Sequence, residues 1–145
     1  MDNTSLRFEI FDDPKAFSRL EAGWESLCDE LTEHVTVFVS YTWYQSWWKY
    51  YSADAKLHLF TMWHGDKLAG IAPLMWKKSS FHKLPVRMVG FIQNNQSLHN
   101  DFIVIPELRT FFLQTLIHSL FEQSSRWDLL YFRNISPISD NYKSL

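Results

Sequence analysis

Residues 37–51 constrain what this chain can fold into more than any other segment, because they hold eight aromatic side chains from Phe38 to Tyr51. Ser40 is a suitable N-cap, and no glycine or proline follows before Ala53, so a short helix is predicted here. Its aromatic side chains fall into two adjacent stripes, Trp43, Trp47 and Tyr50 in one and Tyr44, Trp48 and Tyr51 in the other. Both sides of such a helix need partners. Either both stripes pack into the core, or one lines a groove that meets a ligand.

The length and composition of the chain fit one folded domain. A chain of 145 residues, 46% hydrophobic and 17% aromatic, can bury a large core. The formal net charge of −2 gives no sign of the basic field of a nucleic-acid-binding protein. Cys28 is the single cysteine, so we expect a half-buried thiol in a reducing compartment. With no signal region and no apolar run near the ~18 residues of a membrane span, we expect a cytoplasmic protein without a nucleic-acid partner.

Hydrophobic periodicity predicts an α/β (α+β) fold in which a mostly antiparallel, mixed sheet is covered by helices. Strands are predicted at residues 6–10, 55–63, 68–77, 84–92, 101–105 and 127–132, and helices at residues 14–31, in the aromatic segment and at residues 106–123. The last strand is nearly all apolar, which is typical of a strand buried on both faces. Pro73 predicts a bulge or an edge in its strand. We expect one domain over residues 1–139 and a flexible tail over residues 140–145.

Four segments, in this order, resemble the CelD/BcsL-like acetyltransferases of the GNAT superfamily. They are the Phe-Val-Ser-Tyr-Thr-Trp run with its paired tryptophans at residues 38–48, the Leu-Ala-Gly-Ile-Ala-Pro-Leu-Met strand at residues 68–75, the Asp-containing strand at residues 100–104 and the Trp-Asp-Leu-Leu strand with Arg-Asn-Ile after it at residues 127–135. The resemblance runs over about residues 6–139. The order of predicted elements, β-α-α-β-β-β-(β)-α-β, is also that of the GNAT fold.

This resemblance implies a bacterial, cytoplasmic protein that transfers an acetyl group from acetyl-CoA to an amine or hydroxyl in polysaccharide biosynthesis. Members of the family, like the related Fem-type proteins, carry two GNAT-like halves. The chain corresponds to the N-terminal half, whereas the acyl-donor site and main catalytic residues are generally placed in the second. We therefore expect this half to hold a small-molecule or saccharide acceptor and to be inactive alone.

A GNAT donor site needs backbone N–H groups around the coenzyme A pyrophosphate, offered by a glycine-containing loop at a helix N-terminus. The equivalent place here is the start of the helix at Pro106. Pro106 lacks an N–H, Glu107 would repel phosphate, and no glycine follows Gly90. The residues therefore argue against a donor site in this chain.

The best acid–base candidates are His99 and Asp101, which place an imidazole and a carboxylate together at a strand start. Either could instead have an ordinary role, His99 as a solvated loop residue and Asp101 as a turn cap. His82, Glu33 and His34 are weaker candidates. The six histidines show no metal-ligand spacing, so no metal site is predicted.

Trp43, Trp47 and Trp48, with Lys77 and Lys78, are the predicted substrate-binding residues. Aromatic rings suit stacking on sugar rings, and the two lysines begin a local basic patch that fits an anionic acceptor or only a solvated hairpin end. Two alternatives to the enzyme reading stay open. One is a GNAT-like binding or interaction module that lacks the coenzyme A site, and the other is a homodimer in which a second copy replaces the missing half.

Overall fold

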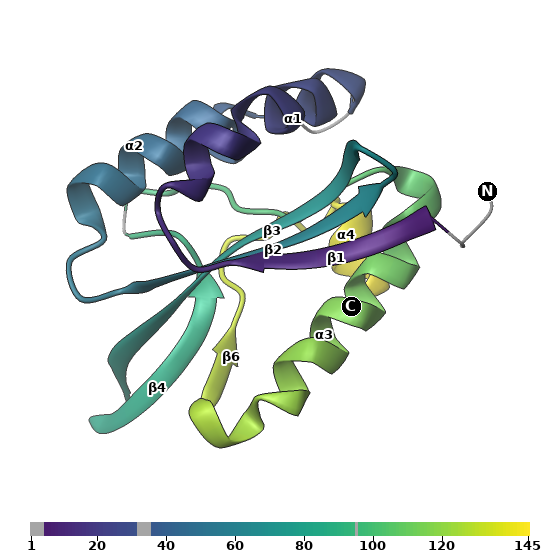
Figure 1. The fold of residues 1–145 in the computed structure, drawn as a ribbon. Helices are drawn as coiled ribbons and strands as arrows, with labels where there is room; N and C mark the ends of the chain where they lie inside the picture. The colour runs from purple at the N-terminus through teal and green to yellow at the C-terminus, as the bar shows by residue number, and fades with distance from the viewer. Residues whose placement is uncertain (1–4, 32–35, 95) are drawn as a thin grey trace.

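A computed structural model describes residues 5–31, 36–94 and 96–145, and it contains one sheet with helices packed on it (Figure 1). In chain order they are β1 (Leu6–Phe11), α1 (Ala16–Glu30), α2 (Tyr41–Tyr51), β2 (Lys56–His64), β3 (Lys67–Phe81), β4 (Leu84–Phe91), β5 (Ile103–Val104), α3 (Arg109–Glu122), β6 (Leu129–Tyr131) and α4 (Asp140–Ser144). Short 3-10 turns lie at Val37–Val39, Pro106–Leu108 and Ser124–Arg126. No helix of the described residues is long and apolar enough to cross a membrane.

The strands form one sheet in the order β1-β2-β3-β4-β6, and β5 pairs with β3. All pairings are antiparallel except that of β4 with β6. Figure 1 shows α1 and α2 on one face of this sheet and α3 on the other. The predicted fold class, a mixed and mostly antiparallel sheet with helices packed on it, is therefore confirmed.

A bulge in β3 lets two residues that are two positions apart, Leu68 and Gly70, face opposite sides of the sheet. The register against β2 shifts between Met62 and Trp63, which leaves Ala69 without a cross-strand partner. As a result Leu68 packs against Gly23 of α1, whereas a Cβ on Gly70 would lie 2.9 Å from the Phe112 ring of α3. The glycine at position 70 thus allows α3 to approach the sheet closely.

Two strands share one side of β3, and Pro73 lies where they separate. β4 pairs with the second half of β3 from Leu74 onward, and β5 pairs with Gly70 and Ile71. Between them the chain leaves the sheet after Ile92, whose N–H donates to the Pro73 carbonyl oxygen at 3.0 Å. A proline is tolerated in this central strand because its missing N–H faces the break between the two partners. The predicted edge or bulge is thus a gap between β4 and β5.

The predicted aromatic helix is α2, and the Ser40 hydroxyl caps it by accepting the backbone N–H of Trp43 at 3.2 Å. Four of its aromatic residues are buried, namely Tyr41, Tyr44, Trp47 and Trp48. Trp24 of α1 lies against this helix and donates its indole N–H to the Val39 carbonyl oxygen at 3.0 Å. The thiol of Cys28 is half-buried as predicted, and burial raises its pKa to about 11. Cys28 is therefore protonated at neutral pH and is not activated as a nucleophile.

Two sequence predictions differ from the structure. β6 is shorter than residues 127–132 and is not buried on both faces, because it is the last strand of the sheet and Tyr131 is 41% exposed. The periodicity of residues 106–123 places Phe111 on the inner side of α3, but Phe111 is 40% exposed and Leu113 is buried instead. The segment at residues 140–145 contains α4, and its Asn141 is buried, while its flexibility stays a prediction.

Candidate functional site

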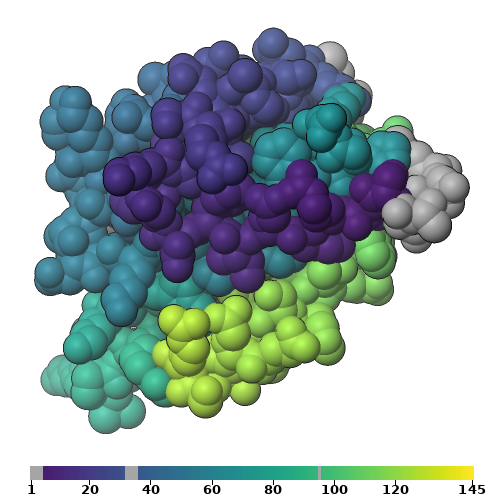
Figure 2. Space-filling model, in the orientation of Figure 1, coloured from purple at the N-terminus to yellow at the C-terminus, as the bar shows by residue number. Residues whose placement is uncertain are grey.

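The predicted binding residues meet at a groove where β3 extends beyond β2. The last pair between these strands joins Lys56 to Trp76, so β3 has no partner on that side from Lys77 onward. The groove has a volume of about 760 Å³, within the range of small-molecule sites. It is lined by the end of α2 and the turn after it, the start of β2, the middle of β3 and β4, and the 3-10 turn at Ser124–Arg126. Figure 2 shows the blue end of α2 above the teal β3–β4 hairpin at the left of the molecule.

Aromatic side chains form two walls of this groove. From α2 come Trp47 and Tyr51, whose ring centroids lie 5.9 Å apart. The Tyr51 hydroxyl donates to Oε1 of Gln96 at 3.2 Å, which ties the end of α2 to the loop after β4. From β3 comes Trp76, which is half-buried and lines the groove.

Positive charge gathers around these rings. Lys56, Lys77, Lys78 and Arg126 line the groove against one unpaired carboxylate, Asp54. Among the described residues no ion pair neutralises any of the four cations. The guanidinium carbon of Arg126 lies 4.9 Å from the centroid of the Trp76 ring, so the aromatic wall and the positive charge are in contact.

Arg87 also lines the groove, but its charge is already matched. Its Nε and Nη2 donate to Oδ2 and Oδ1 of Asp128 at 3.1 and 2.8 Å, and its Nη1 donates to the Ser125 carbonyl oxygen at 2.8 Å. These bonds, with the backbone N–H of Arg87, lower the pKa of Asp128 to about 2. The pair fixes the turn that carries Arg126 against β4.

His58 lies behind Trp76 and is buried, with 4% of its surface exposed. The two rings meet edge-to-face with centroids 5.4 Å apart. Burial lowers the pKa of His58 to about 4, and the charge of Arg126 acts in the same direction, while Asp12 acts weakly against it. The imidazole is therefore neutral at physiological pH, and the groove floor adds no further positive charge.

The structure brings together three of the five predicted substrate-binding residues, Trp47, Lys77 and Lys78. Trp43 and Trp48 do not line this groove. Trp43 packs edge-to-face on Phe38 with centroids 4.8 Å apart, and Trp48 is buried within 6.5 Å of the Phe17 ring. Those two members of the aromatic helix therefore belong to the packing of the domain.

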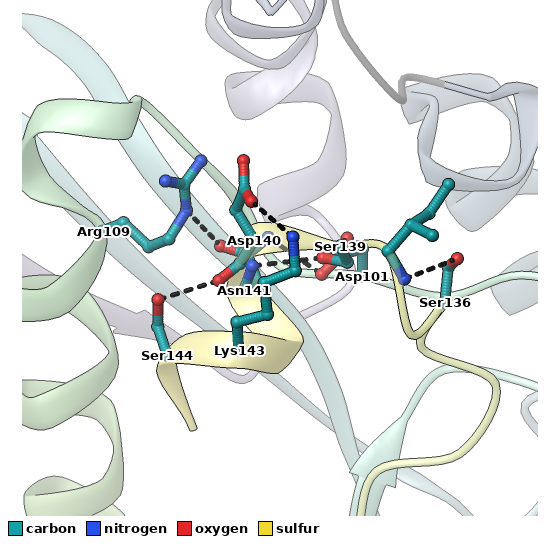
Figure 3. Close-up of polar contacts among 9 residues, drawn as sticks. Asp101, Arg109, Ser136, Ser139, Asp140, Asn141, Lys143 and Ser144 are labelled. Atoms are coloured by element: carbon teal, nitrogen blue, oxygen red, sulfur yellow. Dashed lines mark hydrogen bonds and ion pairs between the residues drawn. The ribbon is translucent and has the colours of Figure 1, made fainter.

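His99 and Asp101 lie outside the groove. Figure 3 shows the Asp101 carboxylate beside the C-terminal segment, where it accepts bonds from Ser139 Oγ at 2.6 Å and from Asn141 Nδ2 at 2.8 Å. It also accepts the backbone N–H of Phe102 at 2.8 Å, so it caps its own strand and anchors α4. His99 is half-buried, and its Nε2 has no hydrogen-bond partner among the described residues. Their catalytic role remains a prediction.

Of the three weaker candidates, His82 alone lies in the described part of the chain. Glu33 and His34 lie outside the described residues, and His82 is at the tip of the β3–β4 turn with a positive φ of 48°. Within the part of the chain that the structure describes, no group of three or more His, Cys, Asp or Glu side chains could hold a metal ion.

The N-terminus of α3 does not fit a coenzyme A pyrophosphate. Pro106, which has no N–H, and the acidic Glu107 form the turn before it. In Figure 3, Asn141 of α4 reaches this end of α3, where its Oδ1 accepts the Nε of Arg109 at 3.0 Å. The carboxylates of Asp101 and Asp140 lie in the same cluster. A proline turn, three acidic side chains and a covering helix are unsuited to a phosphate group.

Three further residues that line the groove were not among the predicted substrate-binding residues. They are Tyr51, Trp76 and Arg126. Trp76 and Arg126 are 50 positions apart in the sequence, and only the parallel pairing of β4 with β6 brings the turn of Arg126 beside β3. The one available signal was the run Trp-Lys-Lys at residues 76–78, in which an aromatic residue adjoins the two predicted lysines.

Comparison with solved structures shows that the fold is shared with acetyltransferases. An aminoglycoside acetyltransferase from an uncultured soil metagenomic sample, solved with trehalose, aligns with a TM-score of 0.50 over 99% of this chain and 85% of its own, at 11% identity. An acetyltransferase of Trypanosoma brucei aligns with a TM-score of 0.50 over 89% of this chain and 82% of its own, at 16% identity. An integron cassette protein from the mobile metagenome of V. cholerae also aligns, with a TM-score of 0.50 over 98% of this chain and 81% of its own, at 12% identity.

At these identities the likeness establishes the GNAT-type fold. No protein-family model and no curated protein matches the sequence.

Proposed function

We propose that this chain is the acceptor-binding unit of an acetyltransferase with the GNAT fold, and that the acetyl-CoA is held by a second GNAT-like unit. One observation carries the proposal. Trp47, Lys77 and Lys78, chosen as acceptor-binding residues from the sequence, line one groove of ligand size in a fold shared with acetyltransferases. The acceptor is a small molecule with an amine or hydroxyl, such as a saccharide in polysaccharide biosynthesis.

The shape of the groove supports a saccharide acceptor. The exposed Tyr51 ring and the accessible parts of Trp47 and Trp76 give the groove aromatic walls for a sugar ring, and the lysines offer N–H donors to its oxygen atoms. One of the structural neighbours was solved with trehalose and again with sisomicin. The groove of this chain would hold such a ligand while leaving one of its amines or hydroxyls accessible.

Acyl transfer needs the donor thioester to reach that nucleophile. Because the N-terminus of α3 does not fit the donor pyrophosphate, we derive no transfer step within this chain. The role of its own residues is to bind and orient the acceptor. His99 and Asp101 remain candidates for general acid–base catalysis. The second unit would supply the acetyl-CoA that the reaction also needs.

A non-catalytic binding module is the second candidate, and the closed N-terminus of α3 favours it. Both candidates predict binding at the groove, so binding alone does not separate them. Activity of the chain together with the proposed second unit does, because an acceptor unit predicts acetylation of the groove ligand from acetyl-CoA, detected by mass spectrometry. A binding module predicts that the ligand is recovered unchanged.

Binding is tested through the indole N–H signals of the seven tryptophans in a nitrogen-15 spectrum. A panel of neutral, amino and phosphorylated sugars should contain members that move the signals of Trp47 and Trp76. The signals of Trp24 and Trp127, whose N–H groups donate to the carbonyl oxygens of Val39 and Leu120, serve as controls that stay in place. If no member of the panel moves the signal of Trp47, the acceptor groove is refuted.

A further inference from the structure

The groove has a charge imbalance that a neutral sugar would leave unmatched. Lys56, Lys78 and Arg126 lie there with one carboxylate, that of Asp54, which forms no ion pair among the described residues, although the chain as a whole has a net charge of −2. Like charges gathered in one groove repel each other unless an anion lies among them. The imbalance therefore indicates that the ligand is negatively charged.

Arg126 is held in place before any ligand arrives. Its guanidinium lies on the Trp76 ring at 4.9 Å, and its Nη1 donates to Oε1 of Gln123 at 2.9 Å. The other guanidinium N–H donors form no side-chain bond among the described residues. A guanidinium fixed in this way loses little conformational entropy when it binds a tetrahedral anion through two N–H groups.

The turn that carries Arg126 is fixed in the same manner. Arg87 of β4 binds the carboxylate of Asp128 on one side of this turn and the carbonyl oxygen of Ser125 on the other. Because its charge is matched by Asp128, Arg87 adds little to the attraction for an anion. We assign it a positioning role, in which it sets the distance between Arg126 and the lysines of β3.

We infer that the acceptor carries a phosphate monoester, bound by Arg126, Lys56 and Lys78 beside Trp76; this inference rests on the proposed acceptor function of the groove. A phosphate monoester has a charge of about −1.5 to −2 at neutral pH, which matches several cations better than a single carboxylate does. At about 760 Å³ the groove is much larger than a phosphate group. The remaining space, walled by Trp47 and Tyr51, suits the sugar ring.

The test is a titration of the whole chain with four probes, namely glucose 6-phosphate, inorganic phosphate, glucuronate and glucose. Glucose 6-phosphate should move the indole signals of Trp47 and Trp76 and bind at least about tenfold more tightly than each of the other three, a difference expected of one charge-assisted hydrogen bond or more. Its affinity should fall as salt is raised from low ionic strength, because the groove is open to solvent.

Variants locate the phosphate. R126Q and K78Q should each weaken glucose 6-phosphate about tenfold, a larger loss than either variant causes for glucose. K83Q is the matched control, because Lys83 is exposed at the tip of the β3–β4 turn and does not line the groove. R87Q, which breaks the bonds to Asp128 and to the Ser125 carbonyl oxygen, should weaken glucose 6-phosphate but not glucose, whereas a loss of folding would weaken both.

Each other result contradicts the inference in a distinct way. If glucose binds as tightly as glucose 6-phosphate, and R126Q and K78Q have no effect, the phosphate is refuted while the acceptor groove stands. If inorganic phosphate binds as tightly as glucose 6-phosphate, the sugar is refuted. If none of the four probes moves the signals of Trp47 and Trp76, the phosphate inference fails, and the wider sugar panel decides the fate of the groove.

Discussion

Gly90 faces the carbonyl oxygen of Tyr131 so closely that a Cβ at this position would lie 2.6 Å from that oxygen. The contact lies in the parallel pairing of β4 with β6, which carries the turn of Arg126 to the groove. Since the neighbouring atom belongs to the backbone, the two strands cannot relax by turning a side chain. The glycine therefore keeps the last strand of the sheet in register.

Replacing Gly90 with alanine should force β4 and β6 apart and destabilise the domain by about 1–3 kcal/mol, as overpacking does elsewhere. Urea unfolding measures this free energy. G23A is the matched control, and it should destabilise the domain less than G90A does. Its new Cβ would lie 3.3 Å from the Leu68 Cβ, a longer contact than that at Gly90, and alanine raises the helix propensity of α1. A G90A variant as stable as the parent chain would show that β6 is not paired as described.

His58 should make the stability depend on pH in the weakly acidic range. Its pKa is about 4 in the folded chain, chiefly because it is buried, and about 6.5 when unfolded. Between these values the unfolded chain binds more protons, so stability is fully present above about pH 6.5 and falls as the pH drops toward 4. The loss should be on the order of 1–3 kcal/mol.

Unfolding by urea at several pH values checks this, with H58Q for comparison. The variant should lose most of the slope between pH 6.5 and 4 while keeping the acid unfolding that the carboxylates cause at lower pH. An unchanged slope in H58Q would mean that His58 titrates normally and is not buried behind Trp76.

The link between Asp101 and Asn141 should stabilise the C-terminal segment. N141A removes bonds to Asp101 Oδ1, to the Phe102 carbonyl oxygen and from Arg109, and leaves these groups partly unsatisfied. We expect a loss of about 1–3 kcal/mol. K143A in the same helix changes an exposed side chain and should stay within about 0.5 kcal/mol of the parent.

Hydrogen exchange of the α4 amides decides whether residues 140–145 are the flexible tail predicted from the sequence. Protection in the parent chain and its loss in N141A would support a docked helix. Exchange at the rate of an unfolded peptide in both proteins would support the flexible tail.

The sequence predicts the parts of the fold that depend on local pattern. The cap at Ser40, the aromatic helix and the hairpin of β2 and β3 follow from spacing and turn chemistry over a few residues. The groove was predictable only in part, because Trp47 and the two lysines stood out in composition. Trp76 did not stand out, because a single tryptophan in an apolar strand is typical of a residue in the hydrophobic core.

The features that were missed depend on contacts between distant segments. Asp101 and Asn141 are 40 residues apart, and nothing near either residue indicates that they form a buried pair. Similarly, the apolar run of β6 resembles a strand buried on both faces, but its place at the end of the sheet leaves Tyr131 exposed. Contacts between distant elements, which the local pattern does not encode, decide both cases.

The central claim is that this chain has an acceptor groove but no donor site of its own, and a thermal-shift titration with acetyl-CoA, with coenzyme A alongside, tests it most directly. A ligand at about 100 times its Kd adds roughly 2.7 kcal/mol to stability, which is a clear rise in Tm. The closed N-terminus of α3 predicts no rise with either compound up to millimolar concentration. A clear rise with acetyl-CoA would contradict the account and show that this chain holds the donor itself.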